Sequence, residues 1–456
     1  MRSPQASSPR MSRAFPAFLL ILSAAAALHP QALAIGEQAS RTTVIKAGRL
    51  FDSEKGAFLD NQYITVQNGR VVGVEASMKD PKGANIIDLG KYTVLPGLID
   101  CHTHLLFLEK IGRQGSGLSS ESVAALVFEG DALRALHGAA RAKTFLEAGI
   151  TTVQDLGNGW QFADVALRDA IEDGSVDGSR MRVSGPGLSA EGGQLPGLLY
   201  RHLPLANDEY RIVRGVDDAV AAVREHLVMG VDVIKVYADS APNVARLSVA
   251  EMAAIVKEAH RYGLRVSAHA VSDTSVRDAA LAGVDSVEHA YSLSDETIQL
   301  LKEKNIFVVP TLLSSDSLAR YVELSGEVDK DVIKKQLQSM HERNRDVLQR
   351  LMKNGIAIAS GSDEYLDLNM PQGQSAKRVL YAYAECGMGV LDILRTTSIN
   401  AAKQLRLENK VGVIKTGSFA DIIAVEGSLE KDIRVLDNIR FVMKGGKVYV
   451  DSSAGR

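Results

Sequence analysis

The feature that most constrains the fold is an alternation between residues 94 and 363, in which short runs rich in Val, Ile and Ala are followed by loops and then by segments with helical spacing of apolar residues. Strands and helices that alternate along a chain predict a parallel sheet covered by helices. Eight runs show the strand pattern: VLPGLID (94–100), TTVQDLG (151–157), MRVSGPG (181–187), DVIKVYA (232–238), RVSAHA (265–270), SVEHA (286–290), IFVVPTL (306–312) and IAIASGSD (356–363).

The segments between these runs have the spacing of helices that pack on a sheet. One stripe of residues 250–263, for example, is formed by Met252, Ile255, Val256 and Ala259. Eight strands that each precede a helix predict an α/β protein with a (β/α)8 barrel of the TIM type. An open doubly wound sheet is the alternative, which a count of strands does not exclude.

The two ends of the chain have a different sequence pattern from the region between them. Residues 42–93 and 411–452 contain short β segments separated by glycine-marked turns. We expect the two ends to pair into one small β-sheet domain made of residues 35–98 and 405–456. Residues 99–404 would then form the barrel.

Residues 1–34 have the pattern of a signal peptide. Arg2, Arg10 and Arg13 precede the apolar run FPAFLLILSAAAAL, and the small-x-small triplet that ends at Ala34 predicts cleavage after that residue. The expected location is therefore secreted or periplasmic. An uncleaved anchor is the alternative, although the run is shorter than the roughly 20 residues that span a bilayer.

Charge and composition narrow the class of partner. Removal of residues 1–34 takes away three arginines and no acid, so the formal net charge changes from −3 to −6. No Lys/Arg cluster is interleaved with aromatic residues, so nucleic acid is not an expected partner. No later segment is apolar for long enough to span a membrane. A chain of 456 residues that is 46% hydrophobic can bury a large core, and a small molecule is the expected partner.

Cysteine use is sparse for an exported chain, since only Cys101 and Cys386 are present. Stability is therefore expected to come from the core. A disulfide between the two is the alternative, although strand alternation turns Cys101 away from the neighbouring histidines.

The first barrel strand ends with two histidines, in the stretch LPGLIDCHTHL. The period of two places the imidazoles of His102 and His104 on one side of the strand, within reach of a single metal ion, and turns Thr103 away. An H-x-H pair alone is also common on polar surfaces. Because the carboxyl ends of barrel strands form the active site, the position of this pair favours a metal site.

The fourth strand, DVIKVYA, contains Lys235 inside an apolar run. A buried ammonium group is costly unless it is paired or modified. One interpretation is a structural ion pair with Asp232 or Asp239. The other is that the amine, deprotonated by burial, adds carbon dioxide and becomes a carbamate that bridges two metal ions. Spacing alone leaves both interpretations open.

Three further strand ends carry groups that suit a metal ion. His269 and His289 end the fifth and sixth strands, and Asp363 ends the eighth. Each has a structural interpretation when it is taken singly, as a hydrogen-bonded core histidine or as a helix-capping aspartate. Their shared position at strand ends favours one site. The predicted metal ligands are His102, His104, Lys235, His269, His289 and Asp363.

These strand ends occur in phrases that resemble the amidohydrolase superfamily, and residues 42–452 resemble its imidazolonepropionase-related branch of dipeptidases and amide hydrolases. The matching phrases are LPGLIDCHTHL, FLEAGITTVQDLG, DVIKVYADS, VKEAHRYGLRVSAHA, LAGVDSVEHA, GIAIASGSDE and GVIKTGSFADIIAV. The resemblance implies a distorted barrel, a β-sandwich built from both chain ends, and a homo-oligomer.

The resemblance also implies two divalent ions per chain, usually zinc. It assigns one ion to His102, His104 and Asp363, the second to His269 and His289, and the bridge to carboxylated Lys235. Single-metal deaminases of the superfamily have a glutamate where this chain has Ser272, which favours two metals. A hydroxide between the ions would attack an amide carbonyl, and Asp363 would carry the proton to the departing amine.

The substrate contacts are less clearly marked. Tyr237 faces the same side of its strand as Lys235 and would donate its phenol to an oxyanion or a substrate carboxylate; a rim aromatic is the structural alternative. Several dipeptidases of the branch carry histidine where this chain has Gln194 and Gln372. Gln194 remains a candidate pocket residue, but these two positions do not explain how a substrate carboxylate would be recognised.

The sequence therefore predicts an exported two-metal hydrolase of an amide bond in a dipeptide, an N-acyl amino acid or a similar conjugate. Hydrolysis of cyclic amides or lactones is one alternative. A non-catalytic, ligand-binding barrel is another, which a metal analysis would separate from the enzyme.

Overall fold

The computed structural model describes residues 42–78, 83–111, 120–158, 162–195, 197–326 and 329–453. The predicted signal peptide, residues 1–34, lies outside this part of the chain. Within the described part, no helix combines the length and the apolarity that a membrane crossing requires.

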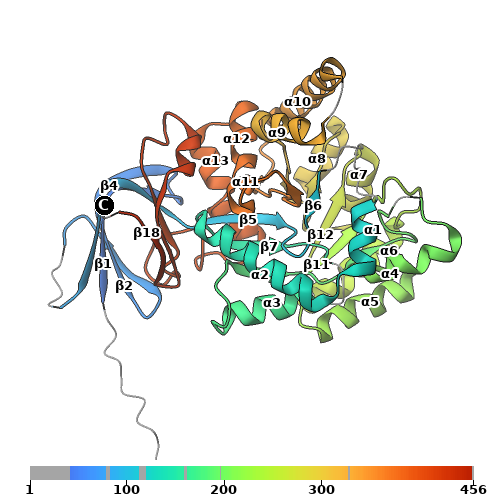
Figure 1. The fold of residues 1–456 in the computed structure, drawn as a ribbon, viewed down its shortest axis with the longest axis horizontal. Helices are drawn as coiled ribbons and strands as arrows, with labels where there is room; N and C mark the ends of the chain where they lie inside the picture. Colours follow the sequence, from blue (N-terminus) through green and yellow to red (C-terminus); the bar gives the residue numbers. More distant parts are fainter. Residues whose placement is uncertain are drawn as a thin grey trace, which may run out of the picture. The chain divides into compact units, whose positions relative to one another are not determined.

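Short parallel strands with helices around them make up the part of the fold between the two chain ends (Figure 1). They belong to two hydrogen-bonded groups, β5-β7-β8 and β10-β9-β11-β12-β13-β14, whose order largely follows the sequence, as expected when a helix follows each strand. The bounds are β5 Leu98–Thr103, β7 Ile150–Asp155, β8 Arg180–Val183, β9 Gly187–Ser189, β10 Tyr210–Ile212, β11 Val233–Tyr237, β12 Arg265–Ala270, β13 Ser286–His289 and β14 Phe307–Val309.

The third predicted strand, residues 181–187, is split in two in the structure. β8 ends at Val183, and β9 begins at Gly187 and pairs with β11. Gly185 between them has a φ of 63°, a left-handed conformation that interrupts an extended strand. The barrel wall continues across this break, because the N–H of Asp232 donates to the carbonyl oxygen of Val183 at 2.8 Å.

Two isolated bridges join the last part of the barrel to the first. Val308 of β14 pairs in parallel with Ile358, and Glu364 pairs in parallel with Thr103 of β5. The ring of strands is therefore closed. The predicted (β/α)8 barrel is confirmed, and the open doubly wound sheet is excluded.

The eighth predicted strand, residues 356–363, is not a regular strand. The N–H of Ser360 donates to the carbonyl oxygen of Thr396 instead of to a neighbouring strand, and Asp363 has a φ of 55°. The segment is instead tied to β5 at its end, where the N–H of Asp363 donates to the carbonyl oxygen of His102 at 2.8 Å. A run of small residues predicts an extended segment here, but tertiary hydrogen bonds decide its path.

The helices pack their apolar stripes against the barrel. The stripe predicted for residues 250–263 is confirmed, because α6 spans Val249–Arg261 and all four predicted residues are buried. Ser248 and Glu251 form a capping box at its start. The other helices are α1 Ser120–Phe128, α2 Asp131–Glu147, α3 Ala163–Glu172, α4 Ala206–Glu209, α5 Val216–Val228, α7 Asp273–Ala282, α8 Asp295–Glu303, α9 Ser315–Ser325, α10 Lys330–Lys353, α11 Gln372–Ala376, α12 Arg378–Glu385, α13 Val390–Thr396 and α14 Ile399–Gln404.

Strands from both chain ends form one seven-stranded sheet, in the order β18-β17-β16-β4-β1-β2-β3. These strands are continuous because β16 pairs antiparallel with β4, and the sheet curls back on itself where Arg70 of the edge strand β3 pairs antiparallel with Phe419. The β domain predicted from both chain ends is therefore confirmed. Ile45, Ile64, Ile422 and Phe441 belong to its buried core. The bounds are β1 Thr43–Asp52, β2 Ala57–Gln67, β3 Arg70–Glu75, β4 Asn85–Pro96, β16 Ile422–Val425, β17 Ile439–Lys444 and β18 Lys447–Asp451.

Gly97 separates this sheet from the barrel. The predicted strand at residues 94–100 therefore contains the end of β4 and the start of β5. A Cβ at Gly97 would lie 2.1 Å from Oγ1 of Thr151. Only glycine therefore fits where these two segments of the chain come close together.

Cys101 and Cys386 are both free and both buried. The disulfide considered as an alternative is not formed, and the fold depends on its core.

Candidate metal centre and active site

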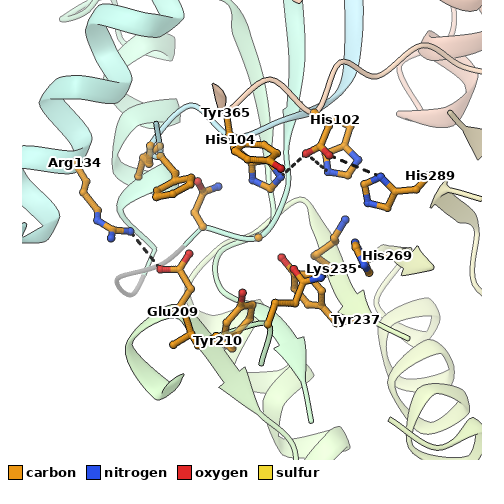
Figure 2. Close-up of a pocket in the computed structure, with 17 residues that line it drawn as sticks. His102, His104, Arg134, Glu209, Tyr210, Lys235, Tyr237, His269, His289 and Tyr365 are labelled. Atoms are coloured by element: carbon orange, nitrogen blue, oxygen red, sulfur yellow. Dashed lines mark hydrogen bonds and ion pairs between the residues drawn. The ribbon is translucent and has the colours of Figure 1, made fainter. Parts of the chain in front are cut away.

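A pocket lies where the carboxyl ends of the barrel strands meet (Figure 2). It is lined by all eight residues that the sequence singled out, which are His102, His104, Gln194, Lys235, Tyr237, His269, His289 and Asp363. Its wall also contains Arg134, Asn158, Glu209, Tyr210 and Tyr365, which the sequence did not single out.

His102 and His104 project from β5 and the residue after it toward one carboxylate. Nε2 of His104 lies 3.0 Å from Oδ1 of Asp363, and Nε2 of His102 lies 3.5 Å from the same oxygen. Thr103 faces the other way, and its hydroxyl donates to Oδ1 of Asp155 at 2.9 Å. The period of two in the strand is thus sufficient to bring both imidazoles to Asp363.

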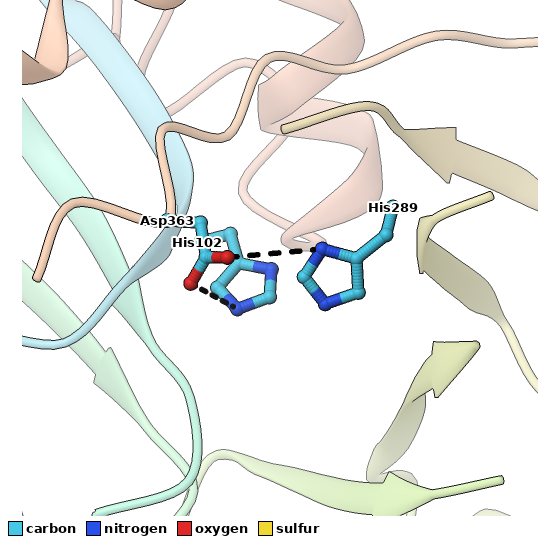
Figure 3. A group of neighbouring side chains, drawn as sticks. All are labelled: His102, His289 and Asp363. Carbon is cyan, nitrogen blue, oxygen red and sulfur yellow. Dashed lines mark ion pairs between the residues drawn. The ribbon is translucent and has the colours of Figure 1, made fainter. Parts of the chain in front are cut away.

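His102, His289 and Asp363 form the most compact group (Figure 3). One potential ligand atom of each lies within 4.8 Å of the other two, and no other group of three or more His, Cys, Asp or Glu side chains in the described ranges is as compact. Burial lowers the pKa of both imidazoles well below the ordinary value, with further lowering by Lys235 at His102 and by His269 at His289. Both rings are therefore neutral near pH 7 and keep a lone pair for a metal ion.

Asp363 is ionised in this surrounding. Burial by itself would raise its pKa, but the interactions with His102, His104 and Lys235, which include a hydrogen bond from His104, outweigh burial and leave the pKa below the ordinary value. A carboxylate here can therefore serve both as a ligand and as a proton acceptor.

His269 lies beside this group. Its ring centroid is 4.5 Å from that of His289. Its Nε2 is 3.1 Å from Oδ1 of Asp239 and 3.1 Å from the amide nitrogen of Gln194. These contacts orient the ring and leave Nδ1 as the nitrogen available to a metal ion.

The register of β12 and β13 does not pair the two histidines directly. His269 lies opposite Glu288, and Ala270 lies opposite His289. In a regular strand, consecutive residues such as Glu288 and His289 would point to opposite faces. The φ angles of His289 (75°) and Ala290 (51°) break this alternation, so both side chains reach the interior.

Lys235 is 1% exposed, and its Nζ has no hydrogen-bond partner within the described part of the chain. Burial lowers the pKa of this amine to about 8. The structural ion pair considered from the sequence is not formed, because Asp232 binds Arg168 and Arg182, and Asp239 contacts a histidine.

Glu288 was missed by the sequence reasoning. It is fully buried, and its carboxylate accepts hydrogen bonds from the hydroxyls of Ser267 and Ser286, at 2.7 and 2.9 Å. The signal was available, because a carboxylate next to the sixth-strand histidine in a buried run needs partners.

Tyr237 and Gln194 line the pocket as expected, but Gln372 does not. Gln372 is the first residue of α11 and is buried outside the pocket wall. Burial raises the pKa of the Tyr237 phenol, so it remains a proton donor across the physiological range.

Comparison with known proteins identifies the class to which this barrel and its histidine-rich pocket belong. Residues 93–449 match the model of the amidohydrolase family, and the chain belongs to that family.

Similar proteins share most of the chain. An imidazolonepropionase from Deinococcus deserti is 27% identical over 398 residues, which cover 82% of this chain and 88% of that protein. A prolidase solved in complex with N-methylphosphonate-L-proline is 27% identical, with a TM-score of 0.76, and the match covers 90% of this chain and 100% of the prolidase chain. An ochratoxinase from A. niger is 25% identical, with a TM-score of 0.75, and the match covers 91% of this chain and 97% of the ochratoxinase chain.

Fold, family and relatives agree on the type of reaction. The chain is an enzyme that hydrolyses a carbon–nitrogen bond. It is related to imidazolonepropionases in sequence and to prolidases in structure.

Proposed function

We propose that the protein hydrolyses the amide bond of a dipeptide, an N-acyl amino acid or a similar conjugate, at a centre of two divalent metal ions, with zinc as the expected metal. One observation carries this proposal. Nζ of Lys235 and Nε2 of His289 are buried in the same pocket and have no hydrogen-bond partner within the described ranges. Unsatisfied buried polar atoms are costly, and ligands to metal ions need free lone pairs.

The amine of Lys235 fits a role as a carbamate. A pKa of about 8 leaves a fraction of neutral amine at physiological pH. The neutral nitrogen would form a bond to the carbon of carbon dioxide and release one proton, which places a carboxylate at the end of the side chain. A carboxylate can bridge two cations, whereas an ammonium group would repel them.

The other side chains divide into two groups around this stem. His102, His104 and Asp363 would bind one ion, because both imidazoles face the same carboxylate. His269 and His289 would bind the second, because their rings are in contact. Nitrogen and carboxylate ligands of this kind suit zinc.

When bound, such ions would supply a water molecule of lowered pKa and would polarise the carbonyl group of the substrate. Hydrolysis joins the oxygen of water to the carbonyl carbon and breaks the bond to nitrogen. Asp363 would accept the proton of the attacking water on its carboxylate and return it to the departing nitrogen, which would otherwise have to leave as an anion. The phenol of Tyr237 would donate a hydrogen bond to the carbonyl oxygen as negative charge develops there.

The sequence relatives favour a second candidate, a ring substrate, since their name denotes an imidazolone. The same residues could open a cyclic amide, because the bond that breaks is again between a carbonyl carbon and nitrogen. The substrate screen should therefore contain cyclic amides as well.

The test is a screen of purified, zinc-loaded protein against dipeptides, N-acyl amino acids and cyclic amides. We expect turnover of at least one open-chain amide and loss of that turnover when a chelator removes the metal. Turnover of cyclic amides alone would favour the second candidate, and turnover that survives complete removal of metal would refute the metal-dependent proposal.

We also propose that the enzyme acts after export and as a homo-oligomer. Export is supported by the arginines, the apolar run and the cleavage triplet within residues 1–34. N-terminal sequencing of the protein recovered outside the cytoplasm should give Ile35 as the first residue. Light scattering of the purified protein tests the oligomer, and a monomer at all concentrations would refute it.

A further inference from the structure

Arg134 is a buried guanidinium group in the wall of the active-site pocket. It belongs to α2, is 1% exposed, and lines the same pocket as the expected metal ligands. Figure 2 shows Arg134 and Glu209 at one end of the pocket and His102 and His289 at the other. Among the described residues that line the pocket, Arg134 and Lys235 are the side chains that can carry a full positive charge at neutral pH apart from the histidines.

The guanidinium of Arg134 is only partly satisfied. Its Nη1 donates to Oε2 of Glu209 at 3.4 Å, a long hydrogen bond. Its Nε lies 3.8 Å from Oε2 of Glu129, beyond hydrogen-bond distance. Nε and Nη2 are buried and have no hydrogen-bond partner in the part of the chain that the structure describes. A guanidinium has five N–H donors, and a buried donor without an acceptor is costly. The Nε and Nη2 edge of Arg134 therefore needs an acceptor.

The two unpaired nitrogens lie on the same edge of the guanidinium plane. On that edge the N–H of Nε and one N–H of Nη2 point in parallel, with the spacing of the two oxygens of a carboxylate. Such a fork binds a carboxylate through two hydrogen bonds at once. Neither a neutral amide nor an ester has two equivalent anionic oxygens for it.

We propose that Nε and Nη2 of Arg134 bind the free carboxylate of the amino acid that forms the leaving part of the substrate. This inference rests on the proposed amide hydrolysis and narrows its substrate class to N-acyl and N-aminoacyl α-amino acids with a free carboxyl end. Arg134 then positions the substrate from the end of the pocket opposite to the metal ligands.

Glu209 distinguishes this role from a purely structural one. Its carboxylate binds the opposite edge of the guanidinium, and its side chain is more exposed than that of Arg134, at 19% against 1%. If Arg134 served only to neutralise Glu209, removal of the Glu209 charge would make Arg134 dispensable. If Arg134 binds the substrate carboxylate, removal of that charge relieves a repulsion between two carboxylates and strengthens binding.

The experiment compares N-acetyl-L-amino acids with the matching N-acetyl-L-amino acid amides, with acetate release as the readout. We expect the wild type to prefer the acids. Arg134→Met should raise KM for the acids about a hundredfold, as for loss of one partner of a buried charge pair, and change KM for the amides little. Glu209→Gln should lower KM for the acids or leave it unchanged. Lys143→Met removes an exposed cation from the same helix and should change neither series.

Equal losses on acids and amides in Arg134→Met, or a loss on acids in Glu209→Gln as large as that in Arg134→Met, would overturn the inference and leave the proposed hydrolysis intact. If Arg134→Met does not fold, Arg134→Lys retains the charge without the fork, and it should still raise KM for the acids more than for the amides. If the wild type releases no acetate from either series, N-acetyl amino acids are not substrates. Calorimetric binding of the same acids and amides then tests Arg134 alone: weaker binding of the acids in the variant supports the carboxylate site, and equal binding overturns it.

Discussion

His102 and Glu288 form a buried pair in which Nδ1 of the imidazole lies 2.9 Å from Oε2 of the carboxylate. Because a carboxylate only accepts hydrogen bonds, it favours the tautomer of His102 with the proton on Nδ1 and the lone pair on Nε2, which faces Asp363. The hydroxyls of Ser267 and Ser286 bind its other oxygen and hold it in place. Carboxylate–imidazole pairs of this kind orient histidine ligands and raise their basicity.

Replacement of Glu288 by glutamine should therefore weaken metal binding. In the wild type, His102 and the two serines use both oxygens of the Glu288 carboxylate. The glutamine amide has only one acceptor oxygen, and its nitrogen cannot accept a hydrogen bond from Nδ1 of His102. We expect roughly a 10- to 100-fold loss of metal affinity or activity, measured by titration with a chelator of known affinity. Glu303→Gln, at an exposed position on α8, is the control. Unchanged affinity in Glu288→Gln would contradict the orienting role.

Gly361 should tolerate no side chain. A Cβ at this position would lie 2.7 Å from Cβ of His102 and 2.5 Å from Cγ1 of Val309. Gly361→Ala should displace His102, lower the metal content and cost about 1–3 kcal/mol of stability, as for overpacking of a core. Metal analysis and thermal unfolding test this expectation against Gly389→Ala, where a Cβ would meet nothing closer than 3.8 Å. Equal metal content in Gly361→Ala and Gly389→Ala would contradict this expectation.

Asp363→Asn should abolish most of the activity and leave the fold intact. Asparagine tolerates the left-handed backbone found at this residue, with a φ of 55°, but its amide cannot accept a proton. We expect kcat to fall by a factor on the order of 10²–10⁴ or more, with the melting temperature of the metal-free protein little changed. Near-normal turnover in this variant would show that another group carries the proton.

Lys377 gives a prediction for stability at alkaline pH. It is buried, its amine donates to the carbonyl oxygen of Leu436 at 2.6 Å, and burial lowers its pKa to about 8 from an ordinary value of 10.5. Between pH 8 and 10.5 the unfolded chain binds more protons at this site than the folded one, so the free energy of unfolding should rise with pH. The rise contributed by this group is at most about 3 kcal/mol.

Urea unfolding of the wild type and of Lys377→Met across this pH range measures the effect. Other groups titrate in both proteins, so the difference between them isolates Lys377. The stability of the wild type relative to the variant should increase from pH 8 to 10.5. A difference that is constant with pH would refute the assigned pKa shift.

The sequence predicts the barrel and the strand ends that bring the expected metal ligands into one pocket, because strands and their ends have a regular period. The alternation of His102, Thr103 and His104 needs no tertiary information. The joint orientation of Glu288 and His289 could not be predicted, since it depends on a left-handed backbone at the end of β13. The period of two predicts to which face of the sheet a side chain points only while the strand remains extended.

Two other features depend on contacts between distant parts of the chain. The segment at residues 356–363 has the composition of a strand, but hydrogen bonds to Thr396 and to β5 replace regular pairing there. The pair of Arg134 and Glu209 joins α2 to α4 through two residues that are 75 positions apart in the sequence, and neither helix carries a motif that marks the pair. A charged residue on an amphipathic helix is usually solvated, so its burial in a pocket wall becomes visible only in the structure.

The most direct test of the central claim is a crystal structure of the zinc-loaded enzyme prepared in the presence of bicarbonate. The account predicts two ions, one bound by His102, His104 and Asp363 and one by His269 and His289, with a carbamate on Lys235 between them. A single ion bound by His102, His289 and Asp363, beside an unmodified Lys235, would contradict it.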